Sequence, residues 1–61
     1  MTTLPQKELL RPDEVALFLD VSRATIYRWI EEGKLPSRKI SDRLIRIPRK
    51  AVLLFVEKED T

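Results

Sequence analysis

The stretch DVSRATIYRWIEEGKLP, residues 20–36, decides how the other parts of this 61-residue chain are interpreted. Ser22 is a favourable N-cap, because its hydroxyl can accept a hydrogen bond from a backbone N–H that has no partner within the helix. Gly33 suits the opposite end, where a helix commonly stops in a left-handed conformation. The stretch therefore predicts a short helix that follows Ser22 and runs to about Glu32.

The two faces of this predicted helix carry different chemistry. At 100° per residue, three apolar residues share one face; they are Ile26, Trp29 and Ile30. The opposite face is basic, small or hydroxyl-bearing; it carries Ala24, Thr25, Tyr27 and Arg28, with Arg23 at its boundary. The apolar face predicts packing in a core, and we assign Trp29 to that core. The outer face needs another explanation.

A second short helix precedes this one. Pro12 suits its first position because the missing N–H would have no partner there, and Asp13 and Glu14 then lie at the positive end of the helix dipole. Apolar residues at helical spacing predict a buried stripe; they are Val15, Ala16, Phe18 and Leu19. The pattern breaks at Asp20 and Val21. A tight turn between two short helices is the helix-turn-helix arrangement.

A β-hairpin and a third helix follow. Period-two alternation over residues 44–47 predicts a strand. Ile40 belongs to a partner strand, and residues 41–43 make the turn between them. Pro48 then opens a helix whose core face is apolar; it carries Val52, Phe55 and Val56.

The predicted fold is mainly α with a small β-hairpin wing, a winged helix-turn-helix of order α-α-β-β-α. We expect a flexible leader over residues 1–9, one domain over 10–58 and a frayed tail over 59–61. The predicted core draws on all the elements; it consists of Val15, Ala16, Leu19, Val21, Ile26, Trp29, Ile30, Ile47, Val52, Phe55 and Val56.

Charge is distributed unevenly along the chain. Residues 22–50 contain nine lysines and arginines against three acids, whereas the rest contains three basic residues and seven acids. A basic middle between acidic flanks is the footprint of a surface that binds a polyanion. We therefore predict that the outer face of the second helix enters the DNA major groove. The wing then contacts the backbone or minor groove; its candidate residues are Arg38, Lys39, Arg43 and Arg46.

The absence of cysteine and histidine narrows the classes of function. It removes disulfides, thiolate chemistry and the usual zinc ligands, and we expect no metal, cofactor, catalytic residue or small-molecule substrate. No apolar run has the length of a membrane span. We expect an intracellular protein with no membrane partner, and not an enzyme.

The run LRPDEVALFLDVSRATIYRWIEEGKLPSRKISDRLIRIPRKAVLLFVEK, residues 10–58, closely resembles the excisionase family of DNA-binding domains, relatives of the MerR winged helix. The resemblance implies a small protein of a bacterium, phage or mobile element that is cytoplasmic and associated with DNA. Such proteins bend DNA beside an attachment site so that an integrase excises, and others regulate transcription. The implied partners are double-stranded DNA and an integrase. Because a single module of this size contacts little DNA, we also expect neighbouring copies of the same protein on the DNA. The implied contact residues are Ser22, Arg23, Thr25, Tyr27 and Arg28 on the helix, with Lys39 and Arg43 on the wing.

Three positions depart from the family pattern. Arg11 stands where Ser or Thr commonly caps the first helix, a loss of about 1 kcal/mol. Asp20 stands where the turn often has glycine, although aspartate tolerates the left-handed conformation at modest cost. Asp42 lies at the wing tip, which in the family is often rich in glycine or doubly basic, and it weakens the attraction of the tip for phosphate.

Two alternatives stay open. A small transcriptional regulator or an antitoxin would use the same fold, and the sequence does not separate it from an excisionase. A protein-interaction module is a function of another class, and excess apolar surface would serve it; the residues concerned are Leu17, Leu53 and Leu54.

Overall fold

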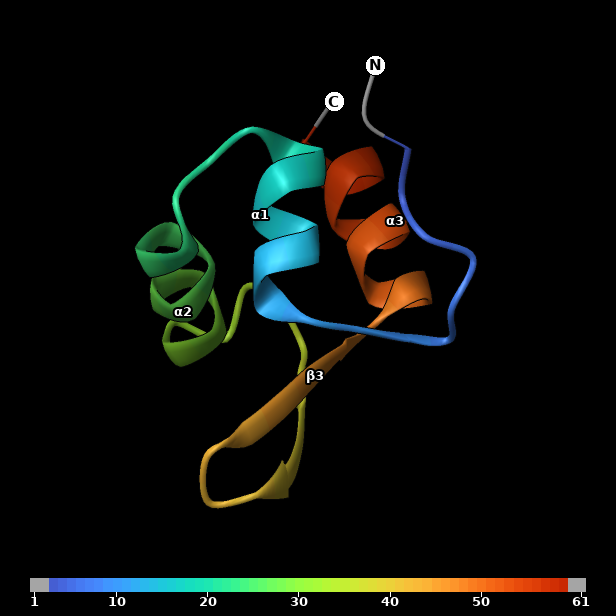
Figure 1. Ribbon diagram of the computed structural model, residues 1–61. Helices are drawn as coiled ribbons and strands as arrows, with labels where there is room; N and C mark the ends of the chain where they lie inside the picture. Colours follow the sequence, from blue (N-terminus) through green and yellow to red (C-terminus); the bar gives the residue numbers. More distant parts are fainter. Residues whose placement is uncertain (1–2, 60–61) are drawn as a thin grey trace.

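The computed structural model describes residues 3–59, with the side chain of Glu59 left out, and it has three helices and three short strands. Figure 1 shows the helices gathered at one end and a hairpin extending from them. The elements in chain order are β1 (Leu9–Leu10), α1 (Pro12–Leu19), α2 (Arg23–Glu31), β2 (Arg38–Ser41), β3 (Leu44–Pro48) and α3 (Arg49–Glu59). The predicted order of three helices and a hairpin wing is confirmed. We use "wing" for β2, β3 and the turn between them.

The sheet contains one strand that the sequence did not predict. Its order is β1-β3-β2, and both pairings are antiparallel. Leu9 pairs with Pro48 and Leu10 with Ile47, so β1 joins the base of the wing to the helices. β3 passes directly into α3, which begins at Arg49, one residue later than predicted.

The start of α1 is stabilised without a capping side chain at Arg11. The Glu14 carboxylate accepts a hydrogen bond from the backbone N–H of Arg11 at 2.8 Å, which is half of a capping box. The Lys7 ammonium lies 2.8 Å from the same carboxylate. Pro12 is the first helical residue, as predicted, and its side chain is buried.

The turn between α1 and α2 has the predicted geometry. Asp20 is left-handed, with φ 57° and ψ 46°, and its backbone N–H reaches the end of α1. Ser22 is extended, and its hydroxyl accepts a hydrogen bond from the backbone N–H of Thr25 at 3.2 Å.

The other end of α2 also stops as predicted. Gly33 has φ 77° just beyond α2, and the Lys34 backbone N–H donates to the Trp29 carbonyl at 2.9 Å.

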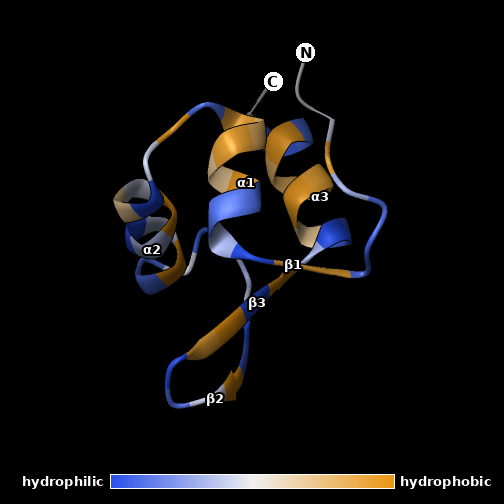
Figure 2. Ribbon diagram, viewed as in Figure 1, coloured by the Kyte–Doolittle hydropathy of each residue, from blue (hydrophilic) through white to orange (hydrophobic). Residues whose placement is uncertain are grey.

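The core lies among the three helices and β3. Figure 2 shows that α1 and α3 are mostly apolar, whereas the turn of the wing is hydrophilic. The buried apolar residues are Leu4, Leu10, Val15, Ala16, Ile26, Leu35, Ile47 and Val52. Five further residues of the predicted core are partly buried and pack against this cluster; they are Leu19, Val21, Trp29, Ile30 and Phe55.

The prediction for Val56 is wrong, because its side chain is 37% exposed. The core face of α3 is centred between Val52 and Phe55, and at 100° per residue Val56 falls about 70° from that centre. Val56 therefore lies at the edge of the apolar stripe of α3, and its side chain lies at the edge of the core.

The segment expected as a flexible leader contributes to the core. Leu4 is 3% exposed, and Leu9 lies in β1. The Arg49 guanidinium donates from Nε to the Pro5 carbonyl at 3.1 Å, and the Arg49 backbone N–H donates to the Glu8 carbonyl at 2.9 Å. The domain boundary expected at residue 10 therefore leaves out residues that pack on the domain. Of the predicted tail, residues 60–61 lie outside the described part of the chain.

Within residues 3–59, no helix combines the length and the apolar character needed to cross a membrane.

Candidate nucleic-acid interface

The outer face of α2 is open to solvent. Arg23, Ala24 and Arg28 are exposed, and 36% of the Tyr27 surface is accessible to solvent. On the opposite face Ile26 is fully buried. Burial of Ile26 fixes the rotation of α2 about its axis, so these outer residues point away from the core.

The N-terminal turn of α2 is held by its own hydroxyl groups. The Ser22 and Thr25 side-chain oxygens lie 2.9 Å apart in a hydrogen bond, besides the bond from the Thr25 backbone N–H. Thr25 is half-buried and Ser22 is exposed. Both residues therefore have a structural role in capping, and each hydroxyl also retains capacity for another hydrogen bond.

The wing places two arginines opposite each other. Arg38 of β2 pairs in register with Arg46 of β3, and Lys39 pairs with Ile45. Like charges directly opposite on neighbouring strands are destabilising. The Arg46 guanidinium donates to the Ile45 carbonyl at 2.9 Å and is half-buried. Arg38 and Lys39 are exposed. This arrangement favours a negatively charged ligand, which would offset the repulsion.

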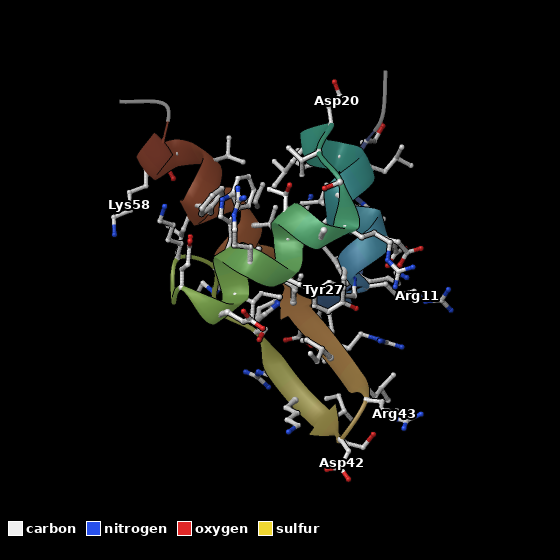
Figure 3. All side chains as sticks on the ribbon, turned by 90° about the vertical axis from the view of Figure 1, so that its left-hand side faces the viewer. Arg11, Asp20, Tyr27, Asp42, Arg43 and Lys58 are labelled. Carbon is white, nitrogen blue, oxygen red and sulfur yellow. The ribbon has the colours of Figure 1, made fainter. Side chains whose placement is uncertain are left out.

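The end of the wing is irregular. The register shifts between Lys39 and Ser41, so that Ile40 lies at a bulge and is 52% exposed. Leu44 is also exposed. Figure 3 shows Asp42 and Arg43 at the tip, with α2 lying across the molecule above the wing and Tyr27 between the two. Tyr27 of α2 and Arg43 of the wing tip thus lie on the same side of the molecule, whereas Arg38 and Lys39, neighbours on β2, point to opposite faces of the wing.

A family model for a helix-turn-helix domain matches residues 9–60 of the chain. The chain belongs to this helix-turn-helix family. The family is a DNA-binding one that is found in excisionase-like proteins and is typically non-enzymatic, so double-stranded DNA is the partner that it implies. A search of curated proteins finds no match to the chain.

Trp29 of this helix-turn-helix domain lies on the inner side of α2. Its ring centroid is 5.0 Å from that of Phe55 of α3, with the two planes tilted by 39°. Aromatic pairs at this separation stabilise a fold beyond the area that they bury. The contact explains why the tryptophan sits on the helix and assigns it to packing between α2 and α3.

The structure also shows two kinds of surface residue that the sequence analysis did not assign to the interface. Ile40 and Leu44 are exposed apolar residues on the wing. Ile40 lies at the bulge, beyond the alternation over residues 44–47, and Leu44 is the first residue of that alternation. Arg49 and Lys50 lie at the start of α3, and counting charge along the sequence included them in the basic tract without locating them.

Two acidic residues at helix ends, Glu14 and Glu32, each pair with a lysine. The hydrogen bond from the Arg11 backbone N–H, followed by the bond from Lys7, lowers the pKa of Glu14 below its usual 4.5. The Glu32 Oε1 atom lies 3.5 Å from the Lys34 Nζ atom at the end of α2.

Among the side chains that the structure describes, no three His, Cys, Asp or Glu residues are grouped so as to hold a metal ion.

Proposed function

We propose that this helix-turn-helix protein binds a specific DNA sequence, bends the DNA and acts as an excisionase in site-specific recombination of a phage or mobile element. The observation that carries the proposal is that Tyr27 of α2 and Arg43 of the wing tip are presented on one side of the molecule (Figure 3). Of the ten residues predicted to contact DNA, all except Thr25 and Arg46 are exposed.

Base reading is the role of α2, which we call the recognition helix. Ala24 has a small side chain near its start, so the helix can approach the floor of the major groove. Arg28 is the long donor on the same face. An arginine that holds a guanine through two hydrogen bonds contributes roughly 1–3 kcal/mol of discrimination.

Backbone binding is the role of the wing. Arg43 at the tip and Lys39 on β2 are positioned for phosphate oxygens, which fix the orientation of a protein on DNA without reading sequence. A phosphate near Arg38 and Arg46 would offset the repulsion between their guanidinium groups. Asp42 limits how far the tip enters the minor groove.

The step from DNA binding to bending rests on size. A single module of this kind buries about 600–1,000 Å² on DNA, and bending a site of 20–30 base pairs costs on the order of 1–6 kcal/mol. One bound copy is therefore too small to sustain a sharp bend, so we propose that a monomer in solution binds neighbouring sites together with other copies. Exposed leucines offer surface for contacts with these copies or with an integrase; they are Leu17, Leu53 and Leu54.

A combined curvature and recombination experiment tests the proposal. The purified protein is mixed with circularly permuted duplexes that carry one or several copies of a site selected from random DNA. We expect strong bending only on duplexes with several sites, and sedimentation of a monomer without DNA. With its cognate integrase and attachment DNA, we expect excision that requires the protein.

The alternative outcomes identify other functions. Specific binding without bending, and without an effect on recombination, would favour a transcriptional regulator or an antitoxin. The absence of any binding to duplex DNA would contradict both and favour a protein-interaction module.

A further inference from the structure

A basic pocket lies beside the base of the wing, away from the recognition helix. Its volume is about 520 Å³, and it forms where the segment 6–9 meets the first residue of β2 and the junction of β3 with α3. The lining contains one acid, Glu8, and four cations: Lys7, Arg38, Arg49 and Lys50. Figure 1 shows α2 on one side of the wing and the segment before β1, with the start of α3, on the other.

Two of the four cations are already held by the fold. Lys7 pairs with Glu14 at 2.8 Å. Arg49 is half-buried, and its Nε donates to the Pro5 carbonyl at 3.1 Å. This bond fixes the guanidinium plane and leaves the terminal N–H groups of Arg49 for a ligand. A fixed guanidinium loses less conformational entropy on binding than a free one.

The other two cations have no counter-charge of their own. Arg38 and Lys50 are exposed, and within residues 3–59 neither forms an ion pair. Arg38 also faces Arg46 across the wing. Residues from three separate parts of the chain thus bring positive charge to one hollow, and Glu8 is the one acid among its lining residues.

We propose that this pocket binds a phosphate group of the DNA backbone, next to the stretch of duplex that the wing contacts. Arg38, Arg49 and Lys50 donate hydrogen bonds to the phosphate oxygens, a match in charge and geometry that guanidinium and ammonium groups provide. Arg38 belongs to the wing and also lines the pocket, so a duplex that the wing contacts passes beside the pocket. The inference rests on the proposed DNA binding and adds to it a third contact, which lengthens the bound site on the wing side.

Lys50→Gln in the full chain tests the pocket, with Lys58→Gln as the matched control. Both substitutions remove one positive charge from an exposed position of α3, but only Lys50 lines the pocket. Binding of each variant to the selected duplex is measured by fluorescence anisotropy over a range of salt concentrations. We expect Lys50→Gln to weaken binding roughly three- to tenfold and to reduce the salt slope by about one, and Lys58→Gln to change both by clearly less.

A second series uses duplexes shortened by a few base pairs at either end. Shortening at the wing-side end is expected to weaken wild-type binding to the level of Lys50→Gln and to leave that variant unchanged. Shortening at the other end is expected to affect both proteins alike. Thermal melting checks folding, and if Lys50→Gln melts early, Lys50→Met replaces it.

The possible outcomes separate this inference from the proposed function. If Lys50→Gln behaves like Lys58→Gln, or its deficit persists on DNA shortened at either end, the pocket does not bind DNA although the protein does. If the wild-type chain binds no duplex at all, the proposed function fails and the pocket inference fails with it.

Discussion

The recognition helix and the wing are held in place by different means. The helix is anchored by a fully buried Ile26 and by the Ser22 cap, and it lies against Phe55 through Trp29. Every residue of β2 is exposed, and only Ile47, near the base of β3, is buried in the wing. The element proposed to read bases is thus preorganised by packing and capping, whereas the element proposed to grip the DNA backbone is exposed along most of its length.

The largest expected effect is a difference in folding stability between two isoleucine variants, one beneath the recognition helix and one on the wing. Ile26→Ala removes a buried side chain from beneath the recognition helix and should cost about 2–5 kcal/mol, comparable with the whole stability of so small a domain. Ile40→Ala, at the exposed bulge of the wing, should change stability by less than about 0.5 kcal/mol. Urea or thermal unfolding measures both. Equal losses would mean that the wing is as firmly packed as the helix.

Arg28→Ala tests whether the recognition helix reads the DNA sequence. We expect a loss of roughly 1–3 kcal/mol in binding to the selected site and little change in binding to random DNA. Competition titrations with both DNAs give the two affinities. A parallel fall in both would reduce Arg28 to a phosphate contact.

Ser22→Ala tests how far capping preorganises the helix. Loss of the hydrogen bond to the Thr25 N–H should cost about 1 kcal/mol of stability, and Ser37→Ala, in the loop before β2, provides a control of the same chemistry. Chemical denaturation measures both variants. If Ser37→Ala also lost about 1 kcal/mol of stability, the effect of Ser22→Ala would not be due to the cap.

Arg43→Gln tests the wing, and its effect should depend on salt more than on sequence. We expect specific and random DNA to be weakened by similar factors, with a salt slope smaller by about one for each phosphate that the variant no longer binds. Lys39→Gln should behave in the same way. An unchanged salt slope in both variants would mean that the wing does not touch the DNA backbone.

The smallest effect concerns acid stability. The pKa of Glu14 is lowered in the folded protein by the Arg11 backbone N–H and by Lys7. Its stabilising contribution is therefore fully present above the unfolded pKa near 4.5 and is lost as the pH falls through the lower folded value. Glu14→Gln should flatten the decline in melting temperature below about pH 5. Glu57→Gln, on the exposed side of α3, is the control and should leave that decline unchanged.

Local signals predicted the helices, and contacts distant in sequence explain what was missed. Pro12, Asp20, Ser22 and Gly33 each impose a conformation on the adjacent backbone, so the limits of α1 and α2 could be placed from sequence. Leu4, Leu10 and Leu35 show no periodicity among their neighbours, and their burial depends on β3 and the helices closing over them. The outer face of α2 was recognisable as soon as its inner face was assigned.

The wing was predictable in outline only. Alternation over residues 44–47 located β3, but the bulge at Ile40 interrupts the partner strand and hides its register. The pairing of Arg38 with Arg46 therefore became apparent only in the folded chain. The pocket beside it could not be predicted from the sequence either, because it joins residues 6–9 to residues 49–50, which are far apart along the chain.

The direct passage from β3 into α3 has a mechanical consequence. Pro48 ends the strand with a fixed φ and Arg49 begins the helix, so no loop lies between them to absorb a change of angle. We therefore expect a rotation of the hairpin to rotate α3 with it. We expect that DNA which twists the wing also reorients Leu53 and Leu54, so that the surface offered to a neighbouring protein depends on the shape of the bound duplex.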